Sequence, residues 1–201
     1  GFDGAILFSD ILMVPWALGQ DLTFGPGEGP RLAPIVDGRE ALERLQNPDH
    51  AKLQPIYETV ERVVAALPPH VTMLGFAGSP WTVATYMIAG QGSKDQAEAR
   101  QLAYADPELM RALIDTIVTL TVDYLAEQHR AGVQAVQLFD SWAGSLSPQQ
   151  FERWVIEPNA RITARLRERC PELVVIGFPK GAGGKLPAYA RETGVDAVGL
   201  D

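Results

Sequence analysis

Five short apolar runs, each followed by small or polar residues, constrain the fold of this chain more than any other feature. Runs that stay apolar at consecutive positions are typical of strands buried on both faces inside a parallel sheet. Where these runs lie, we expect strands near residues 4–9, 71–76, 134–139, 173–178 and 195–200. The sequence therefore predicts one parallel sheet.

Helical patterns lie between these runs. Apolar residues recur on one side of a predicted helix at about residues 55–67. Asp106 is a favoured N-cap residue, and Pro107 suits the first helical turn because an N–H there would have no helical partner. A long amphipathic helix is predicted from this point to Arg130.

Two further segments carry cap and turn signals. Residues 147–150, Ser-Pro-Gln-Gln, match a capping box and predict a helix that runs toward Cys170, with a kink at Pro158. Residues 20–39 are rich in Gly and Pro, and we expect them to form an excursion loop.

The alternation of strands and helices indicates an α/β fold, built either as an open doubly wound sheet or as a (β/α)8 TIM barrel. Small and polar residues stand at the strand ends, and in a barrel these ends meet at one mouth. They are Ser9, Asp10, Gly78, Ser79, Asp140, Ser141, Lys180 and Asp201. We favour the TIM barrel, with residues 1–201 as a single domain holding about five of the eight strands.

Composition excludes several classes of function. The formal net charge is −8 and no Lys/Arg cluster stands out, so we expect neither nucleic acid nor an anionic membrane as a partner. The sequence lacks the run of about 18 apolar residues that a membrane span needs. Cys170 is the one cysteine, which excludes a disulfide framework and is typical of a reducing compartment. We expect a cytoplasmic protein.

Motifs for cofactors and metals fail on inspection. The stretch GFPKGAGGK departs from the phosphate-loop pattern at Pro179. The stretch GQGSKD has Asp95 where a dinucleotide fingerprint needs Gly. The three histidines lack the spacing of metal ligands. We therefore expect no cofactor and no metal.

The polar and aromatic residues near the strand ends have two interpretations. Asp10 and Ser141 stand where a ligand would meet the barrel mouth, and they are also residue types favoured as helix N-caps. Tyr86 and Trp81 could line a pocket or pack in the core. Residue types and spacing leave both interpretations open, and they indicate a site without indicating a reaction.

Four longer stretches carry a resemblance to a known family. FSDILMVPWALG, GFAGSPWTVATYM, QLFDSWAGSLSP and the final VGLD resemble uroporphyrinogen decarboxylase in matching order and spacing. The resemblance implies a cofactor-free TIM barrel of haem and chlorophyll biosynthesis, usually a homodimer. It also implies a small-molecule substrate, uroporphyrinogen III, whose four acetate side chains become methyl groups to give coproporphyrinogen III.

The same resemblance implies roles for individual residues. Asp10 is the catalytic carboxylate that binds the pyrrole N–H groups of the substrate. Tyr86 and Ser141 hydrogen-bond its carboxylates, and Phe76 lines the cleft. Trp81 is expected to pack in the core.

Two family features are missing from this sequence: an arginine-containing motif ahead of Asp10, and a C-terminal part with a substrate-binding histidine. We therefore expect an internal segment of the enzyme, inactive by itself. Two alternatives stay open. A related corrinoid-dependent thiol methyltransferase would need a His-x-Cys zinc motif, where this chain has IGFPKG. A non-catalytic binding or assembly module is the other.

Overall fold

The computed structural model describes residues 2–25, 27 and 29–201. Within these residues the main sheet has five parallel strands, in the spatial order β1-β4-β5-β6-β7. The strands are β1 (Gly4–Ile6), β4 (Thr72–Gly78), β5 (Ala135–Asp140), β6 (Val174–Pro179) and β7 (Ala197–Val198). Each strand lies beside the one before it, whereas a doubly wound sheet reverses its order. The sheet is therefore an arc of barrel wall, and the prediction of a partial TIM barrel is confirmed.

The predicted strands are all present, but β1 and β7 are shorter than expected. Pairing between β1 and β4 stops at Ile6, beyond which Gln128 takes the place of the strand. Its side-chain oxygen accepts the backbone N–H of Phe76 and its amide nitrogen donates to the carbonyl of Phe76, both at 3.1 Å. Because a side chain completes the backbone pairing of β4, β1 can leave the sheet early and carry Asp10 away from it.

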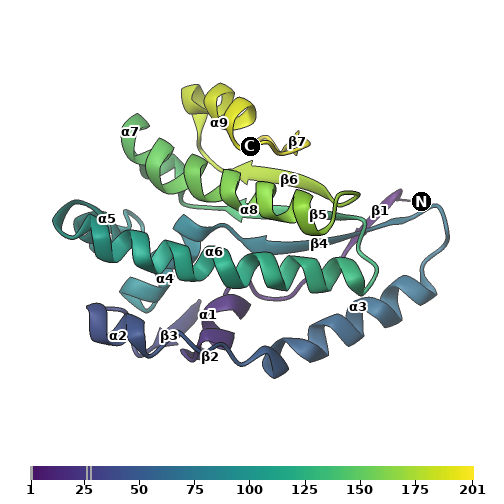
Figure 1. Ribbon diagram of the computed structural model, residues 1–201, viewed down its shortest axis with the longest axis horizontal. Coiled ribbons are helices and arrows are strands. Elements are labelled where there is room, and N and C mark those ends of the chain that lie inside the picture. The colour runs from purple at the N-terminus through teal and green to yellow at the C-terminus, as the bar shows by residue number, and fades with distance from the viewer. Residues whose placement is uncertain (1, 26, 28) are drawn as a thin grey trace.

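Helices flank the sheet between successive strands. They are α1 (Met13–Leu18), α2 (Arg39–Glu43), α3 (Gln54–Ala66), α4 (Pro80–Ala89), α5 (Ala97–Ala105), α6 (Pro107–Arg130), α7 (Pro148–Phe151), α8 (Glu157–Arg169) and α9 (Leu186–Glu192). Figure 1 shows α6 and α8 running side by side along the sheet. We call the sheet face that they cover the outer face and the opposite one the inner face. Within the described ranges, no helix has the length and apolar character needed to cross a membrane.

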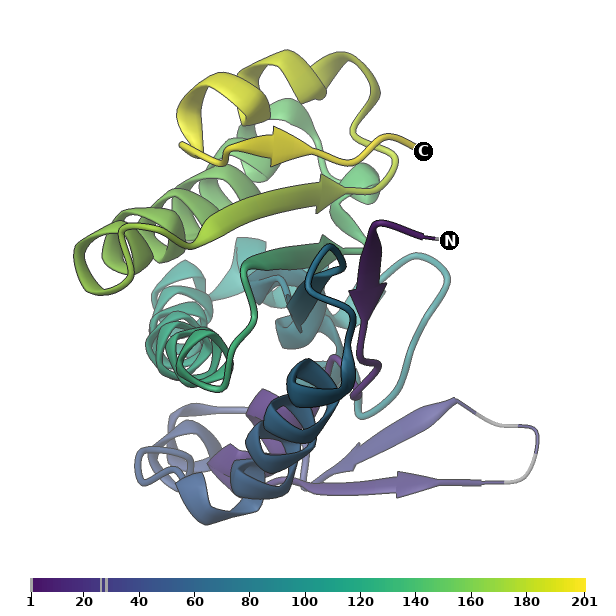
Figure 2. The ribbon, with the colours of Figure 1, turned by 90° about the vertical axis from the view of Figure 1, so that its right-hand side faces the viewer.

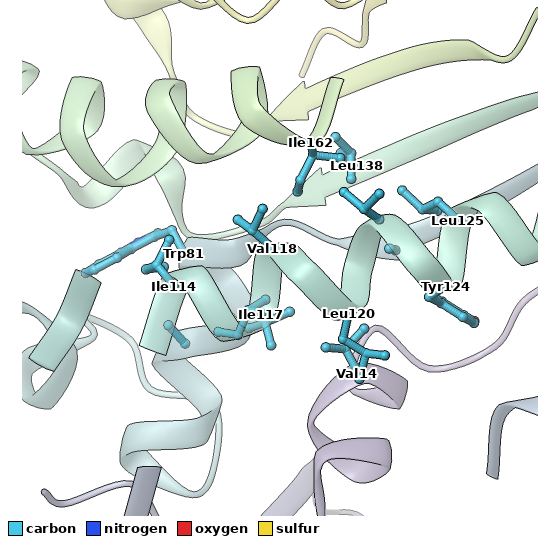
Figure 3. Close-up of a cluster of buried hydrophobic side chains, with 14 of the residues drawn as sticks. Val14, Trp81, Ile114, Ile117, Val118, Leu120, Tyr124, Leu125, Leu138 and Ile162 are labelled. Carbon is cyan, nitrogen blue, oxygen red and sulfur yellow. The ribbon is translucent and has the colours of Figure 1, made fainter. Parts of the chain in front are cut away.

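Helix α6 confirms its sequence prediction at both ends. The Asp106 carboxylate accepts the N–H of Leu109 at 2.9 Å, and the helix ends at Arg130. Gly132 follows with φ of 115°, a backbone conformation that a side chain would strain. Figure 3 shows the buried cluster around this helix, with Trp81 of α4 and Ile162 of α8 packed against it.

The predicted helix from residue 147 is present but interrupted. Ser147 accepts the N–H of Gln150 as an N-cap, while the side chain of Gln150 bonds Trp154 and does not complete a capping box. Residues 152–156 form a π-helical turn, in which the N–H of Glu157 reaches back five residues. Pro158, the predicted kink, is the second residue of α8 and directly follows this π-helical turn, whose wider backbone accommodates a residue without an N–H.

The prediction that residues 20–39 form an excursion loop was wrong in part. Strands β2 (Asp21–Phe24) and β3 (Pro30–Ala33) pair as an antiparallel hairpin, seen at the lower right of Figure 2. Leu32 is buried, and its N–H bonds the carbonyl of Gly90 at the end of α4 at 2.8 Å. The signal was weak because the Gly and Pro residues of the turn outweighed two short strands.

Candidate functional site

The inner face of the sheet carries an apolar hollow near the carboxyl ends of β1, β4 and β5. Its volume is about 270 Å³, and it is lined by Ile6, Phe8, Ile11, Phe76 and Phe139. The ring centroids of Phe8 and Phe76 are 5.8 Å apart, and those of Phe76 and Phe139 are 5.7 Å apart. Phe178 of β6 continues this row at 5.8 Å from Phe139. The hollow is thus an aromatic surface with a small recess.

Asp10 is flanked in the chain by Phe8 and Ile11, which both line this hollow. Its Oδ1 accepts the N–H of Leu12 at 2.8 Å, so the carboxylate opens the turn that leads into α1. Burial raises the pKa of Asp10, and the bond from Leu12 partly opposes that shift. A carboxylate has about four lone-pair sites, so this bond leaves acceptor capacity for a ligand. The capping role exists and does not exclude a binding role.

The segment that carries Asp10 is held from α6. The hydroxyl groups of Ser9 and Tyr124 share a hydrogen bond of 3.0 Å. Tyr124 is buried, which raises its pKa to about 12, so it stays a neutral phenol at neutral pH. Sequence reasoning placed Tyr124 only in the apolar stripe of the helix. The signal for its second role was the polar tip on a residue of that stripe.

Tyr86 of α4 lies close enough to Asp10 for the two groups to interact electrostatically. Burial raises the pKa of Tyr86, the charge of Asp10 raises it further, and the nearby Trp142 indole N–H lowers it without forming a full hydrogen bond. On another side Tyr86 lines a recess of about 280 Å³ together with Arg31 and Gln91. Sequence reasoning missed Arg31 because it assigned this segment to a loop.

Ser141 follows β5 at the same edge of the sheet as Asp10 and is half-buried. The next residue, Trp142, ties this loop to α4: its N–H bonds the Thr82 hydroxyl at 3.1 Å, and its carbonyl accepts the Trp81 indole N–H at 3.3 Å. Trp81 is fully buried, as expected of a packing residue. These contacts connect the loop that carries Ser141 to α4, the helix that carries Tyr86.

Other strand-end residues turn away from this region. Ser79 and Asp140 are fully buried on the outer face, where they bond Asn159 and Thr82. Asp201 is exposed and accepts the N–H of Gly181 at 2.7 Å. In the described part of the chain, no group of three His, Cys, Asp or Glu side chains is arranged to hold a metal ion.

The fold is shared with a solved methyltransferase from Methanosarcina mazei, with a TM-score of 0.74 over 98% of this chain and 57% of that one. Sequence identity is 15%, so this likeness concerns the fold alone. The methyltransferase confirms that the arc of strands is a barrel-type architecture.

Sequence relatives are much more similar. The uroporphyrinogen decarboxylases of Rhizorhabdus wittichii and Sphingopyxis alaskensis are each 67% identical to this chain, and that of Brucella anthropi is 51% identical. Each alignment covers 100% of this chain and 58%, 58% and 59% of the relatives, so the chain spans less than two thirds of their length. Residues 1–201 match the family described as Uroporphyrinogen decarboxylase (URO-D). The chain belongs to the uroporphyrinogen decarboxylase family.

Proposed function

We propose that the protein decarboxylates the four acetate side chains of uroporphyrinogen III to give coproporphyrinogen III. Family membership supports this activity, and one structural observation carries it: the half-buried Asp10 stands beside an aromatic hollow with Tyr86 within electrostatic reach. The substrate is a macrocycle of pyrrole rings joined by methylene bridges, with N–H donors at its centre, and a combination of aromatic wall and carboxylate suits these rings and donors.

The reaction explains why a carboxylate is useful there. Protonation of a pyrrole carbon makes the ring an iminium cation, which accepts the electron pair of the breaking bond to CO2. The exocyclic carbon then takes up a proton to become a methyl group, and the ring loses its extra proton. Positive charge therefore develops on the ring, and a fixed carboxylate in a water-poor cleft stabilises it more than it stabilises the neutral substrate.

Each proposed residue has a separate task. Asp10 accepts the pyrrole N–H bonds, and these donors favour its charged form, against the effect of burial. The hydroxyl groups of Tyr86 and Ser141 donate to substrate carboxylates, and Arg31 adds a positive charge beside Tyr86. Phe76 supplies apolar wall next to the ring. No step of this scheme calls for a cofactor.

The alternatives have less support. A thiol methyltransferase would need soft zinc ligands after a strand, but β6 ends in Phe178 and Pro179, and Cys170 ends the distant helix α8. A non-catalytic module gives no reason for a half-buried carboxyl group with spare acceptor capacity close to an aromatic hollow. We further propose that the protein is a cytoplasmic homodimer, as the family resemblance implies. Light scattering on the purified protein tests whether it is a dimer.

The activity is tested with the full-length protein encoded by the gene. The protein is incubated with uroporphyrinogen III prepared without oxygen, and the products are oxidised and separated by their number of carboxylates. We expect stepwise loss of carboxylates to the coproporphyrin level. A well-folded protein that leaves the substrate untouched would contradict the proposed function.

A further inference from the structure

Two neighbouring polar residues at the end of β5 differ in burial. Ser141, the first residue after the strand, is half-buried, while the preceding Asp140 is fully buried on the outer face. Oδ1 of Asp140 accepts the Thr82 hydroxyl at 2.6 Å, and the same hydroxyl oxygen accepts the backbone N–H of Trp142 at 3.1 Å. The Thr82 side chain therefore bridges the two residues that flank Ser141.

This bridge connects the two elements that carry the proposed carboxylate contacts. Thr82 and Tyr86 are one turn apart on α4, so both side chains lie on the same side of the helix. The loop after β5 carries Ser141 between the two partners of Thr82. The indole bond from Trp81 to the Trp142 carbonyl joins the same helix and loop a second time. The separation of Tyr86 and Ser141 is thus set by these contacts.

The chemistry of Asp140 argues against a role in stability alone. Its Oδ2 has no hydrogen-bond partner among the described residues although the atom is buried. Burial raises the pKa of Asp140 to about 7, and the bonds from Thr82 only partly oppose that shift. A buried carboxyl group with an unsatisfied oxygen costs stability relative to an apolar residue of similar size. Its value lies in the geometry that it imposes.

We propose that Thr82 and Asp140 are positioning residues, which hold Ser141 and Tyr86 at the spacing that two substrate carboxylates require. This inference rests on the proposed function, because it is that substrate which the two hydroxyl groups bind. Neither Thr82 nor Asp140 touches the substrate. The bridge requires a hydroxyl group at residue 82 and an acceptor at residue 140, and it does not require a charge.

The test compares Thr82→Val with Thr85→Val in the full-length protein. Thr85 is buried on the same helix, but its hydroxyl donates only to the carbonyl of Thr82. We expect Thr82→Val to lower kcat/KM at least about tenfold, mainly through KM, because carboxylate binding loses its geometry. Thr85→Val should stay within about threefold of wild type, and the two variants should have similar melting temperatures.

Conservative variants separate the bridge from mere packing. Thr82→Ser keeps the hydroxyl and should recover most of kcat/KM, and Asp140→Asn keeps an acceptor and should do so as well. Asp140→Ala should behave like Thr82→Val. Hydrogen exchange of the peptide over residues 141–146 should speed up in the two damaging variants and not in Thr85→Val.

The outcomes distinguish the two proposals. Wild-type turnover with equal kcat/KM in Thr82→Val and Thr85→Val would overturn the positioning role and leave the decarboxylase function standing. If Thr82→Val does not fold, Thr82→Ser is compared with Asp140→Ala. An equal loss of activity in these two variants would also overturn the positioning role. Absence of turnover in wild type removes the function itself, and the positioning role with it.

Discussion

The inner and outer faces of the sheet differ in the kind of side chain they carry and in how far it is exposed. The inner face presents aromatic rings to a recess, and Phe8 there is 80% exposed. The outer face is closed under α4, α6 and α8, yet it encloses polar groups such as Thr82, Asp140 and Asn159. The described strands form an open arc of barrel wall, so the exposure of Phe8 follows from the open sheet, and the enclosed polar groups carry the contrast. The difference supports the proposal that the inner face binds the ligand and that the outer face positions the loops around it.

The largest effect is expected on the inner face, from Asp10→Asn. Asn keeps the shape and can still accept the N–H of Leu12, but it provides no counter-charge for a cationic ring. We expect kcat to fall about 100-fold or more, roughly 3 kcal/mol of transition-state stabilisation, with product binding and melting temperature close to wild type. Steady-state kinetics on anaerobic substrate and a thermal melt measure both quantities.

Asp106→Asn is the matched control, because Asp106 also caps a helix but lies outside the cleft. Its kcat should equal that of wild type. Near-normal kcat in a folded Asp10→Asn variant would reduce Asp10 to a helix cap. The inner face would then be a packing surface like any other, and the contrast between the two faces would lose its functional meaning.

Sequence reasoning recovered what depends on local patterns. The strands and helix α6 were predicted because apolar runs, Asp106 and Pro107 act within their own segments. The hairpin was missed because pairing between β2 and β3 is decided by contacts across a turn rich in Gly. Arg31 was missed with it.

The orientation of the residues at the strand ends was the second feature that the sequence could not predict. Asp140 and Ser141 are neighbouring polar residues, and only their register against α4 decides that Asp140 is enclosed and Ser141 is not. Likewise, no pattern in the sequence indicates that Gln128 completes the pairing of Phe76. Both features come from helices packed against the sheet, which single-segment periodicity does not describe.

The outer face gives the largest expected effect on stability, in Gly75→Ala. A Cβ at this position would lie within van der Waals overlap of the Gln128 amide, which reaches Phe76 across the glycine. Displacing Gln128 leaves the N–H and carbonyl of Phe76 unpaired. We expect the free energy of unfolding to fall by about 2 kcal/mol in urea titrations. Gly184→Ala, where a Cβ meets nothing within 4 Å, should leave it unchanged, and equal effects would contradict the role of Gln128.

A pH-dependent effect on stability is expected from Asp140. Its pKa is about 7 in the folded protein against 3.8 ordinarily, so between these values the folded state binds more protons than the unfolded state. Through this group, the free energy of unfolding therefore falls as pH rises from about 4 to 7, and it levels off above that range. Asp140→Asn lacks this loss, so its stability relative to wild type should increase with pH across the window.

Urea titrations of both proteins at several pH values between about 4 and 8 measure that difference. Asp49→Asn, a change at an exposed helix cap, provides the baseline. A difference that stays constant with pH would mean that Asp140 is not penalised by burial. In that case the buried carboxylate of Asp140 would not destabilise the outer face, and this difference between the two faces would disappear.

The smallest effect is expected at the rim of the inner face, from Arg31→Gln. Arg31 lines the recess beside Tyr86 and is an exposed residue, so solvent screens its charge. An exposed ion pair with a substrate carboxylate contributes about 0.2–1 kcal/mol, so KM should rise by at most about fivefold while kcat stays unchanged. The difference from wild type should shrink as salt is added, because screening removes what the charge contributed.

Arg44→Gln, which breaks an exposed pair with Glu40 on α2, controls for the loss of one positive charge elsewhere and should leave KM as it is. A fall in kcat in Arg31→Gln at all salt concentrations would place Arg31 among the groups that act on the transition state. The inner face would then extend through the hairpin, and the recess beside Tyr86 would belong to the reaction centre itself.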